Sequence, residues 1–196
     1  MTHYEDEIAA AYTLMNQGDM DEALEHVLKA IGHESKKAEA HALASHIYGL
    51  LDEPEKALEH STQAYELSPG DNSIALGHAI FLMGIGDFKK AIQVTDGVLE
   101  RNNISEAHHI RSNIFLNMGD EKKALEEAEK VFEETVANSD DDEARLDFAM
   151  CLYENKKYDM AEKLFEELVN KEFQKDLSET YLDRIWWRKN RKKFNF

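Results

Sequence analysis

The chain has 196 residues, of which 42% are hydrophobic and 32% are charged, a composition that excludes an intrinsically disordered chain and predicts one domain or a short array of units. Acidic residues outnumber basic residues by 40 to 23, and a body with this net charge of −17 repels nucleic acid phosphates and anionic membranes. The single cysteine, Cys151, excludes an intrachain disulfide and a zinc site built from cysteines, and it gives no reason to expect an oxidising compartment.

A helical hairpin is predicted near the start of the chain and then recurs at intervals of about 34 residues. Its turn begins as Gly18-Asp19, and aligned copies of the segment that follows place one alanine each: Ala23, Ala57, Ala91, Ala124 and Ala161. A second small residue lies twelve positions before each of these alanines: Ala11, Ser45, Ala79, Ser112 and Ala149. Small residues at this spacing predict two antiparallel helices that cross closely. One such hairpin cannot bury its apolar stripe, but stacked copies can.

These residues, together with Pro69 after the second copy, resemble the tetratricopeptide repeat. The resemblance implies an all-α solenoid of helix-turn-helix units with about eleven helices in total. It covers residues 4–175 as five repeats: 4–37, 38–71, 72–104, 105–141 and 142–175. The chain departs from the family's pattern in three ways. Only one copy keeps the proline, the fourth copy is three residues longer, and the family's early tryptophan position holds other residues: Glu7, His41, Ala75, His108 and Arg145.

Residues 176–191 are predicted to form a terminal helix, because Leu177, Tyr181 and Ile185 recur every four residues. Ser178 is the candidate N-cap of this helix. Arrays of repeats need such a helix to cover their last apolar face.

No motif in the sequence predicts catalysis, a cofactor or a metal site. Gly84-Ile85-Gly86 lacks the third glycine of a phosphate-binding loop, and the acidic run 139–143 lacks the alternating ligands and the glycine of a calcium loop. The nine histidines are interpreted as structural, with His41, His78 and His108 at core positions of the repeats, and Cys151 as a buried, inert thiol. The sequence therefore predicts a protein that is not an enzyme.

The resemblance also implies a binding surface, because the first helix of each family repeat lines a concave groove that holds peptides. Carried over position by position, the groove residues are Ile8, Tyr12, Met15, His46, Leu76, Ile80, Met83, His109, Asn113, Leu116, Leu146, Met150 and Tyr153. Acidic residues occupy the second position of four repeats: Glu5, Glu39, Glu106 and Glu143. An apolar floor beside an acidic row favours an amphipathic peptide or helix with basic character, and the alternative occupant is a second copy of this chain.

The C-terminal residues differ from the rest of the chain in charge. Residues 184–196 contain six of the 23 basic residues and no acid, so residues 1–183 carry a net charge of −23. Trp186 is expected to pack on the fifth repeat and Trp187 to be more exposed. The residues expected to contact another macromolecule are Trp187, Arg188, Arg191, Lys192 and Phe194. The acidic body favours a protein over nucleic acid as the partner of this tail, and the groove of a second copy is one candidate.

The leading hypothesis for function is a cytoplasmic, non-enzymatic adaptor or scaffold that binds a segment of a partner protein. One alternative is a cytoplasmic chaperone for an apolar segment of a secreted or assembling partner. Another is a factor that contacts nucleic acid or a membrane through the basic tail. The longest apolar stretch, residues 74–85, is too short to predict a transmembrane helix.

Overall fold

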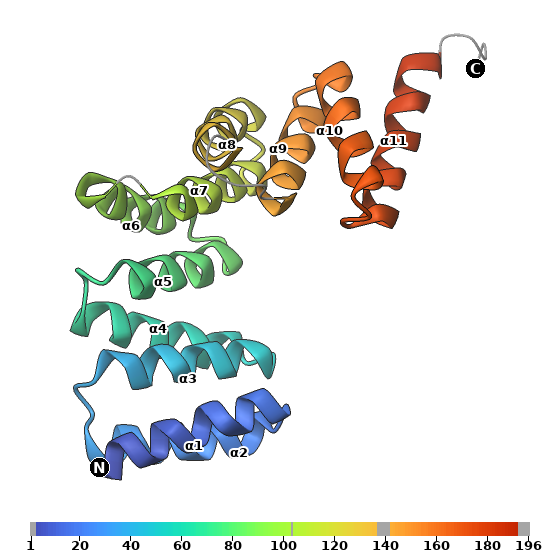
Figure 1. The fold of residues 1–196 in the computed structure, drawn as a ribbon. Coiled ribbons are helices and arrows are strands. Elements are labelled where there is room, and N and C mark those ends of the chain that lie inside the picture. The colour runs from blue at the N-terminus through green and yellow to red at the C-terminus, as the bar shows by residue number, and fades with distance from the viewer. Residues whose placement is uncertain (1–2, 103, 137–141, 192–196) are drawn as a thin grey trace. The chain divides into compact units, whose positions relative to one another are not determined.

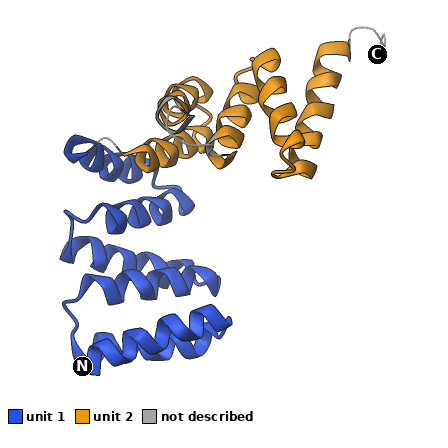
Figure 2. Ribbon diagram, viewed as in Figure 1, with its two compact units in different colours: residues 1–103 blue, residues 104–196 orange. Residues whose placement is uncertain are grey.

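The computed structural model describes residues 3–102, 104–136 and 142–191, and within these ranges it contains eleven α-helices and no strand (Figure 1). The all-α prediction is confirmed. The chain divides into two compact units, residues 1–103 and residues 104–196 (Figure 2). No helix in the described ranges has the length and hydropathy that a membrane span requires.

Unit 1 (residues 1–103) consists of six helices. They are α1 (His3–Gln17), α2 (Met20–His33), α3 (Ala38–Leu50), α4 (Pro54–Leu67), α5 (Asn72–Gly84) and α6 (Phe88–Arg101). Unit 2 (residues 104–196) contains the other five described helices. They are α7 (Ser105–Asn117), α8 (Glu121–Val136), α9 (Asp142–Glu154), α10 (Tyr158–Asn170) and α11 (Lys175–Asn190).

The turns between paired helices share one geometry. Gly18, Gly86 and Gly119 have φ between 75° and 89°, a left-handed conformation that glycine adopts without steric cost. Each turn closes with a backbone hydrogen bond in which the residue after the left-handed position donates to a carbonyl of the preceding helix, as from Asp87 N to Leu82 O at 2.9 Å. In the second and fifth turns the left-handed residues are Asp52 and Lys156, so the backbone geometry is kept where glycine is absent.

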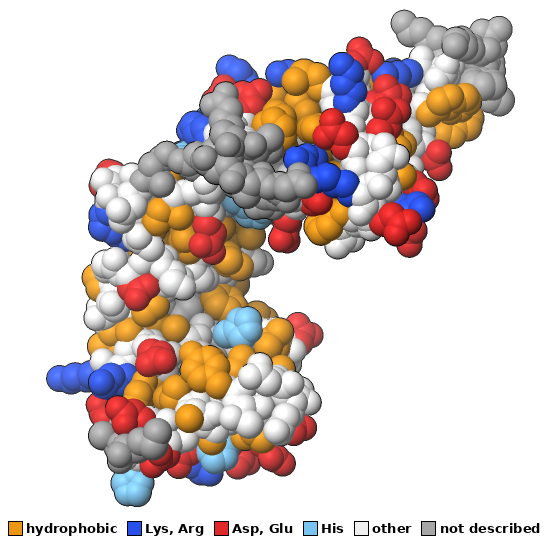
Figure 3. All heavy atoms as spheres, in the orientation of Figure 1, with side chains coloured by type: hydrophobic (Ala, Val, Ile, Leu, Met, Phe, Trp, Pro, Cys, Tyr) orange, Lys and Arg blue, Asp and Glu red, His pale blue; other side chains and the backbone are white. Residues whose placement is uncertain are grey.

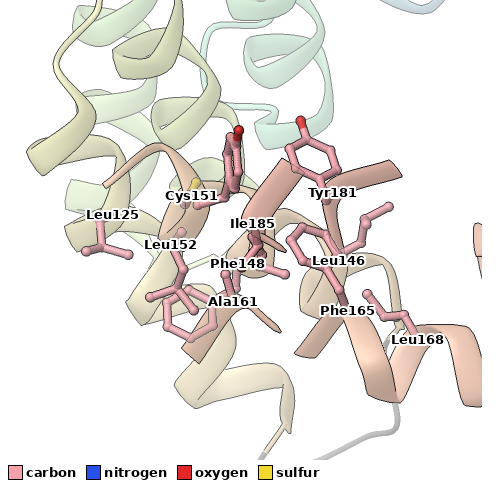
Figure 4. Packing of buried hydrophobic residues seen from close by; sticks show 13 residues of the cluster. Leu125, Leu146, Phe148, Cys151, Leu152, Ala161, Phe165, Leu168, Tyr181 and Ile185 are labelled. Atoms are coloured by element: carbon pink, nitrogen blue, oxygen red, sulfur yellow. The ribbon is translucent and has the colours of Figure 1, made fainter. Parts of the chain in front are cut away.

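The small residues of the repeating pattern lie in the interior of both units. All five aligned alanines are fully buried, and each small residue twelve positions earlier is at most 5% exposed. These positions let paired helices approach closely, as the spacing predicts. Larger apolar side chains fill the space around them and form two separate clusters, one over α1–α4 in unit 1 and one over α8–α11 in unit 2. Figure 4 shows the cluster of unit 2.

The terminal helix α11 covers the core of unit 2. Ile185 is fully buried, and the Tyr181 ring stacks on Phe165 with the ring centres 4.8 Å apart. The structure corrects two details of the sequence prediction. The helix begins at Lys175, so the buried Ser178 lies inside it and is not its N-cap. Trp186 is 50% exposed, almost as much as Trp187 at 54%, because both side chains project from α11 away from the core.

Candidate protein-binding surfaces

The predicted groove residues of unit 1 fall into two groups by exposure. Ile8 and Leu76, which occupy the fifth positions of their repeats, are buried and belong to the interior. The ninth positions reach the surface: Tyr12 on α1 is 46% exposed, Ile80 on α5 is 45% exposed, and His46 on α3 is also exposed. Met15 and Met83 are half-buried beside them. Hydrophobic side chains are accordingly visible at the surface of unit 1, with histidine among them (Figure 3).

A pocket of about 220 Å³ opens between three helices of unit 1. Its lining residues are Ala42, Ser45 and His46 from α3, Ser61 and Ala64 from α4, and Ser73, Ile74, Gly77, His78 and Phe81 from α5. Most of these side chains are small, which is why the helices leave space here. An apolar cavity of about 150 Å³ can hold benzene, so this pocket has room for one large side chain of a ligand.

Glycines shape the pocket and its neighbourhood. A Cβ atom added at Gly49 would lie 3.1 Å from Cε1 of Phe81, so the missing side chain of Gly49 lets the Phe81 ring rest against α3. A Cβ atom at Gly77 would meet no atom within 4 Å, since Gly77 faces the open pocket. In the sequence alone, Gly77 is a glycine inside a predicted helix, which costs about 1 kcal/mol relative to alanine. Its place in a pocket depends on the packing of α3 against α5.

Histidine and serine form the polar part of the pocket wall. Nδ1 of His78 lies 3.0 Å from Oγ of Ser61, and the His78 ring stacks on Tyr65 with the ring centres 5.2 Å apart. Burial lowers the pKa of His78 below its ordinary value, and the nearby Lys90 lowers it further. The imidazole is therefore neutral at pH 7. A neutral wall suits an apolar or weakly polar ligand group.

An acidic group borders the exposed residues of α1. The hydroxyl of Tyr4 donates a hydrogen bond to Oε2 of Glu39 on α3 at 3.4 Å. Burial and the charge of Glu39 raise the pKa of Tyr4 to about 12, and the same two causes raise the pKa of Tyr12. The charge of Glu39 therefore acts on the exposed Tyr12 as well, so unit 1 presents apolar surface together with negative charge.

The predicted groove residues of unit 2 form a more polar and more closed surface. Leu146 and Tyr153 are buried, while Asn113, Leu116 and Met150 are half-buried. His109 is also half-buried, and its Nδ1 lies 2.8 Å from Oδ2 of Asp147. This hydrogen bond raises the pKa of His109. The space beside these two residues is only about 10 Å³, too small for a ligand side chain.

The predicted tail contacts are placed in part. Trp187 and Arg188 are exposed on α11, and Arg191 is exposed directly after it, whereas Lys192 and Phe194 lie outside the described residues. Among the described residues, no group of three histidine, cysteine, aspartate or glutamate side chains is arranged to hold a metal ion. Cys151 is buried, and its burial raises the pKa of its thiol.

Comparisons with known proteins agree with this architecture. Residues 38–71 and 116–179 each match family models described as tetratricopeptide repeat, and together they span half of the chain. A search of curated protein sequences found no match. A solved tetratricopeptide repeat protein from Parabacteroides merdae is 20% identical with a TM-score of 0.76, and the match covers 94% of this chain and 73% of that one.

Two further solved structures have similar folds. The type IV pilus biogenesis factor PilW is 18% identical with a TM-score of 0.76, over 85% of this chain and 76% of that one. A thermophilic protein of the same repeat class from Thermus thermophilus is 17% identical with a TM-score of 0.71, over 93% of this chain and 98% of that one. Likeness at these levels of identity concerns the fold alone.

Proposed function

Because this chain belongs to the tetratricopeptide repeat family, whose fold supports protein–protein interaction, we propose that it is a non-enzymatic adaptor that binds an amphipathic segment of a partner protein. We further propose that the repeats are 4–37, 38–71, 72–104, 105–141 and 142–175, with 176–191 as the cap. The cytoplasm is the proposed compartment, since one cysteine allows no intrachain disulfide.

The pocket between α3, α4 and α5 is the observation that carries this proposal. One large apolar side chain of the ligand enters the pocket, and the exposed Tyr12 and Ile80 contact neighbouring apolar groups. The Glu39 carboxylate favours a basic residue on the edge of the same segment. The pocket is smaller than the 300–1,000 Å³ or so of typical small-molecule sites, which favours a side chain of a partner over a metabolite.

Filling the pocket tests the proposal. Gly77→Leu places a side chain into open space, and it removes a helical glycine at the same time. In affinity capture followed by mass spectrometry, the main partner of the wild-type chain is expected to be lost with Gly77→Leu. Ile80→Glu combined with Met83→Glu is expected to have the same effect, because both changes put charge on the contact surface.

Gly77→Ala is the matched control, because its methyl group meets no neighbour and leaves most of the pocket open. It is expected to keep the partner and to raise the free energy of unfolding by up to about 1 kcal/mol. A partner that still binds Gly77→Leu would place the binding surface elsewhere. A captured partner that is unfolded without this chain would indicate a chaperone role instead of an adaptor role.

A further inference from the structure

Unit 2 contains an open cleft of about 750 Å³ that is separate from the pocket of unit 1. Tyr153 and Glu154 line it from the end of α9. The rest of the lining comes from α11 and from Arg191, the residue that follows its last turn: Thr180, Asp183, Arg184, Trp187, Arg188 and Arg191. We call this surface the arginine cleft.

Arg184 and Arg188 lie on one face of α11, and Arg191, which follows its last residue with helical dihedral angles, continues that face. Their spacing of four and then three residues places Arg184, Arg188 and Arg191 within about 60° of one another around the helix axis. Within the described parts of the chain, none of these three guanidinium groups forms an ion pair. Lys189, which projects from another side of α11, differs in this respect, because its Nζ lies 2.6 Å from carboxylate oxygens of both Asp159 and Glu162.

Aromatic side chains lie next to the arginines of the cleft. Arg184 sits over the Tyr181 ring, with Cζ 5.3 Å from the ring centre. Arg188 and Tyr153 of α9 both line the cleft. The indole of Trp187 is 54% exposed and lines the cleft beside them. Tryptophan and arginine together are the residue types that contribute most to binding energy at protein interfaces.

We propose that the arginine cleft binds an acidic segment of a partner protein that carries at least one aromatic or large apolar side chain. Each planar guanidinium group donates two parallel N–H hydrogen bonds to the two oxygens of a carboxylate of the segment. The apolar side chain packs on the Trp187 indole. Glu154 and Asp183, which also line the cleft, accept hydrogen bonds from backbone N–H groups of the segment.

The same residues argue against other occupants. Two carboxylates in the lining and a net charge of −23 over residues 1–183 repel a long polyanion such as nucleic acid, or an anionic lipid surface, more strongly than a short acidic segment that brings only a few charges close. A second copy of this chain offers many acids, but within the described ranges every aromatic residue that adjoins an acid in the sequence is buried or half-buried. A partner protein with an exposed segment that contains both acidic and aromatic residues fits the cleft better than nucleic acid, a lipid surface or a second copy of this chain.

Binding of labelled polymers to the full chain tests the proposal. The probes are a random copolymer of glutamate and tyrosine, polyglutamate, a single-stranded DNA oligonucleotide, and vesicles containing phosphatidylserine. Fluorescence anisotropy, and co-sedimentation for the vesicles, are expected to show that the glutamate–tyrosine copolymer binds most tightly. Arg184→Glu combined with Arg188→Glu is expected to lower the affinity for this copolymer roughly tenfold or more. Trp187→Ala is expected to lower the affinity for the copolymer but not the affinity for polyglutamate.

The matched control is Lys122→Glu combined with Lys163→Glu, which changes the net charge equally at exposed sites of unit 2 outside the cleft. This control is expected to change the affinity for the copolymer by no more than about twofold, which is the general effect of the altered net charge. Circular dichroism checks the fold, and Arg191→Glu repeats the test at the end of α11, where loss of packing is least expected.

Four results would overturn the proposal. The first is an equal loss of affinity in the arginine and lysine variants, which would mean general electrostatics. The second is preferential binding of DNA or vesicles. The third is loss of copolymer binding when the chain is ended after Arg191, which would place the contact in residues 192–196. The fourth is self-association in light scattering that the arginine variants abolish, which would make a second copy the occupant.

Discussion

Histidine side chains in the two units have pKa values shifted in opposite directions. In unit 1, burial is the main cause that lowers the pKa values of His60 and His78. The pKa of His60 is lowered further by His41 and raised in part by Glu59. The pKa of His78 is lowered further by Lys90 and raised in part by Glu66. The unfolded chain therefore takes up these protons first as the pH falls below about 6.5. In unit 2, the hydrogen bond to Asp147 raises the pKa of His109, so its contribution to stability is present below about pH 6.5 and is lost as the pH rises through its folded pKa.

We predict that lowering the pH from about 7.5 to about 5.5 lowers the stability of unit 1 relative to that of unit 2. Both tryptophans lie in α11, so their fluorescence reports unit 2, whereas circular dichroism reports all helices. At the lower pH, the loss of the circular dichroism signal is expected to begin at a lower urea concentration than the change in fluorescence. The circular dichroism transition is then broader than at the higher pH. His78→Asn is expected to reduce this effect, and the exposed control His33→Asn is not. Coincident transitions at both pH values would contradict the prediction.

Three helices, α5, α6 and α7, contribute no buried residue to the two clusters. Of these three, α5 and α6 each contain an interior glycine, Gly77 in α5 and Gly97 in α6, whereas α7 contains none. A glycine costs about 1 kcal/mol relative to alanine in a helix interior. We therefore expect the pocket of unit 1 to be built partly on a helix, α5, that opens more easily than its neighbours.

We predict that backbone amides of residues 72–102 exchange with solvent faster than those of residues 105–131. Hydrogen exchange with mass spectrometry measures this difference directly. Gly77→Ala and Gly97→Ala are expected to slow exchange in their own helices, because added methyl groups at both positions meet no close contact. Equal protection of the two segments in the wild-type chain would show that packing compensates for the glycines.

At the scale of the whole molecule, two separate clusters stabilise the chain. Each cluster draws its buried residues from one unit, α1–α4 in unit 1 and α8–α11 in unit 2. In repeat arrays, stability is approximately the sum of local terms and interfaces between neighbours. Damage to one cluster should therefore affect distant helices little.

We predict that Ile185→Ala lowers the free energy of unfolding of unit 2 by about 2–5 kcal/mol, because Ile185 is fully buried against the core. Hydrogen exchange in α1–α4 is expected to stay unchanged while exchange in α9–α11 accelerates. Trp187→Ala is the control on the same helix, and it should have a small effect because more than half of that side chain is exposed. Faster exchange across all helices would show that the chain unfolds as one cooperative body.

The helices and their pairing could be predicted from the sequence because they depend on local chemistry. Glycine at positive φ closes three of the five hairpin turns, and alanine at a fixed spacing permits close crossing of each pair. The left-handed turns at Asp52 and Lys156 follow from the same spacing, since the surrounding pattern continues where glycine is missing. The terminal helix was also predictable from its apolar spacing, although its first residue was not.

Only the tertiary structure decided which of the predicted groove residues reach the surface. The fifth positions Ile8 and Leu76 are covered while the ninth positions Tyr12 and Ile80 are exposed, and this depends on how closely neighbouring helices approach. The unit 1 pocket and the arginine cleft likewise require residues from two or three helices, which no single periodicity brings together. Periodicity assigns a side chain to a face of its own helix, but the neighbouring helices determine how much of that face solvent or a ligand can reach.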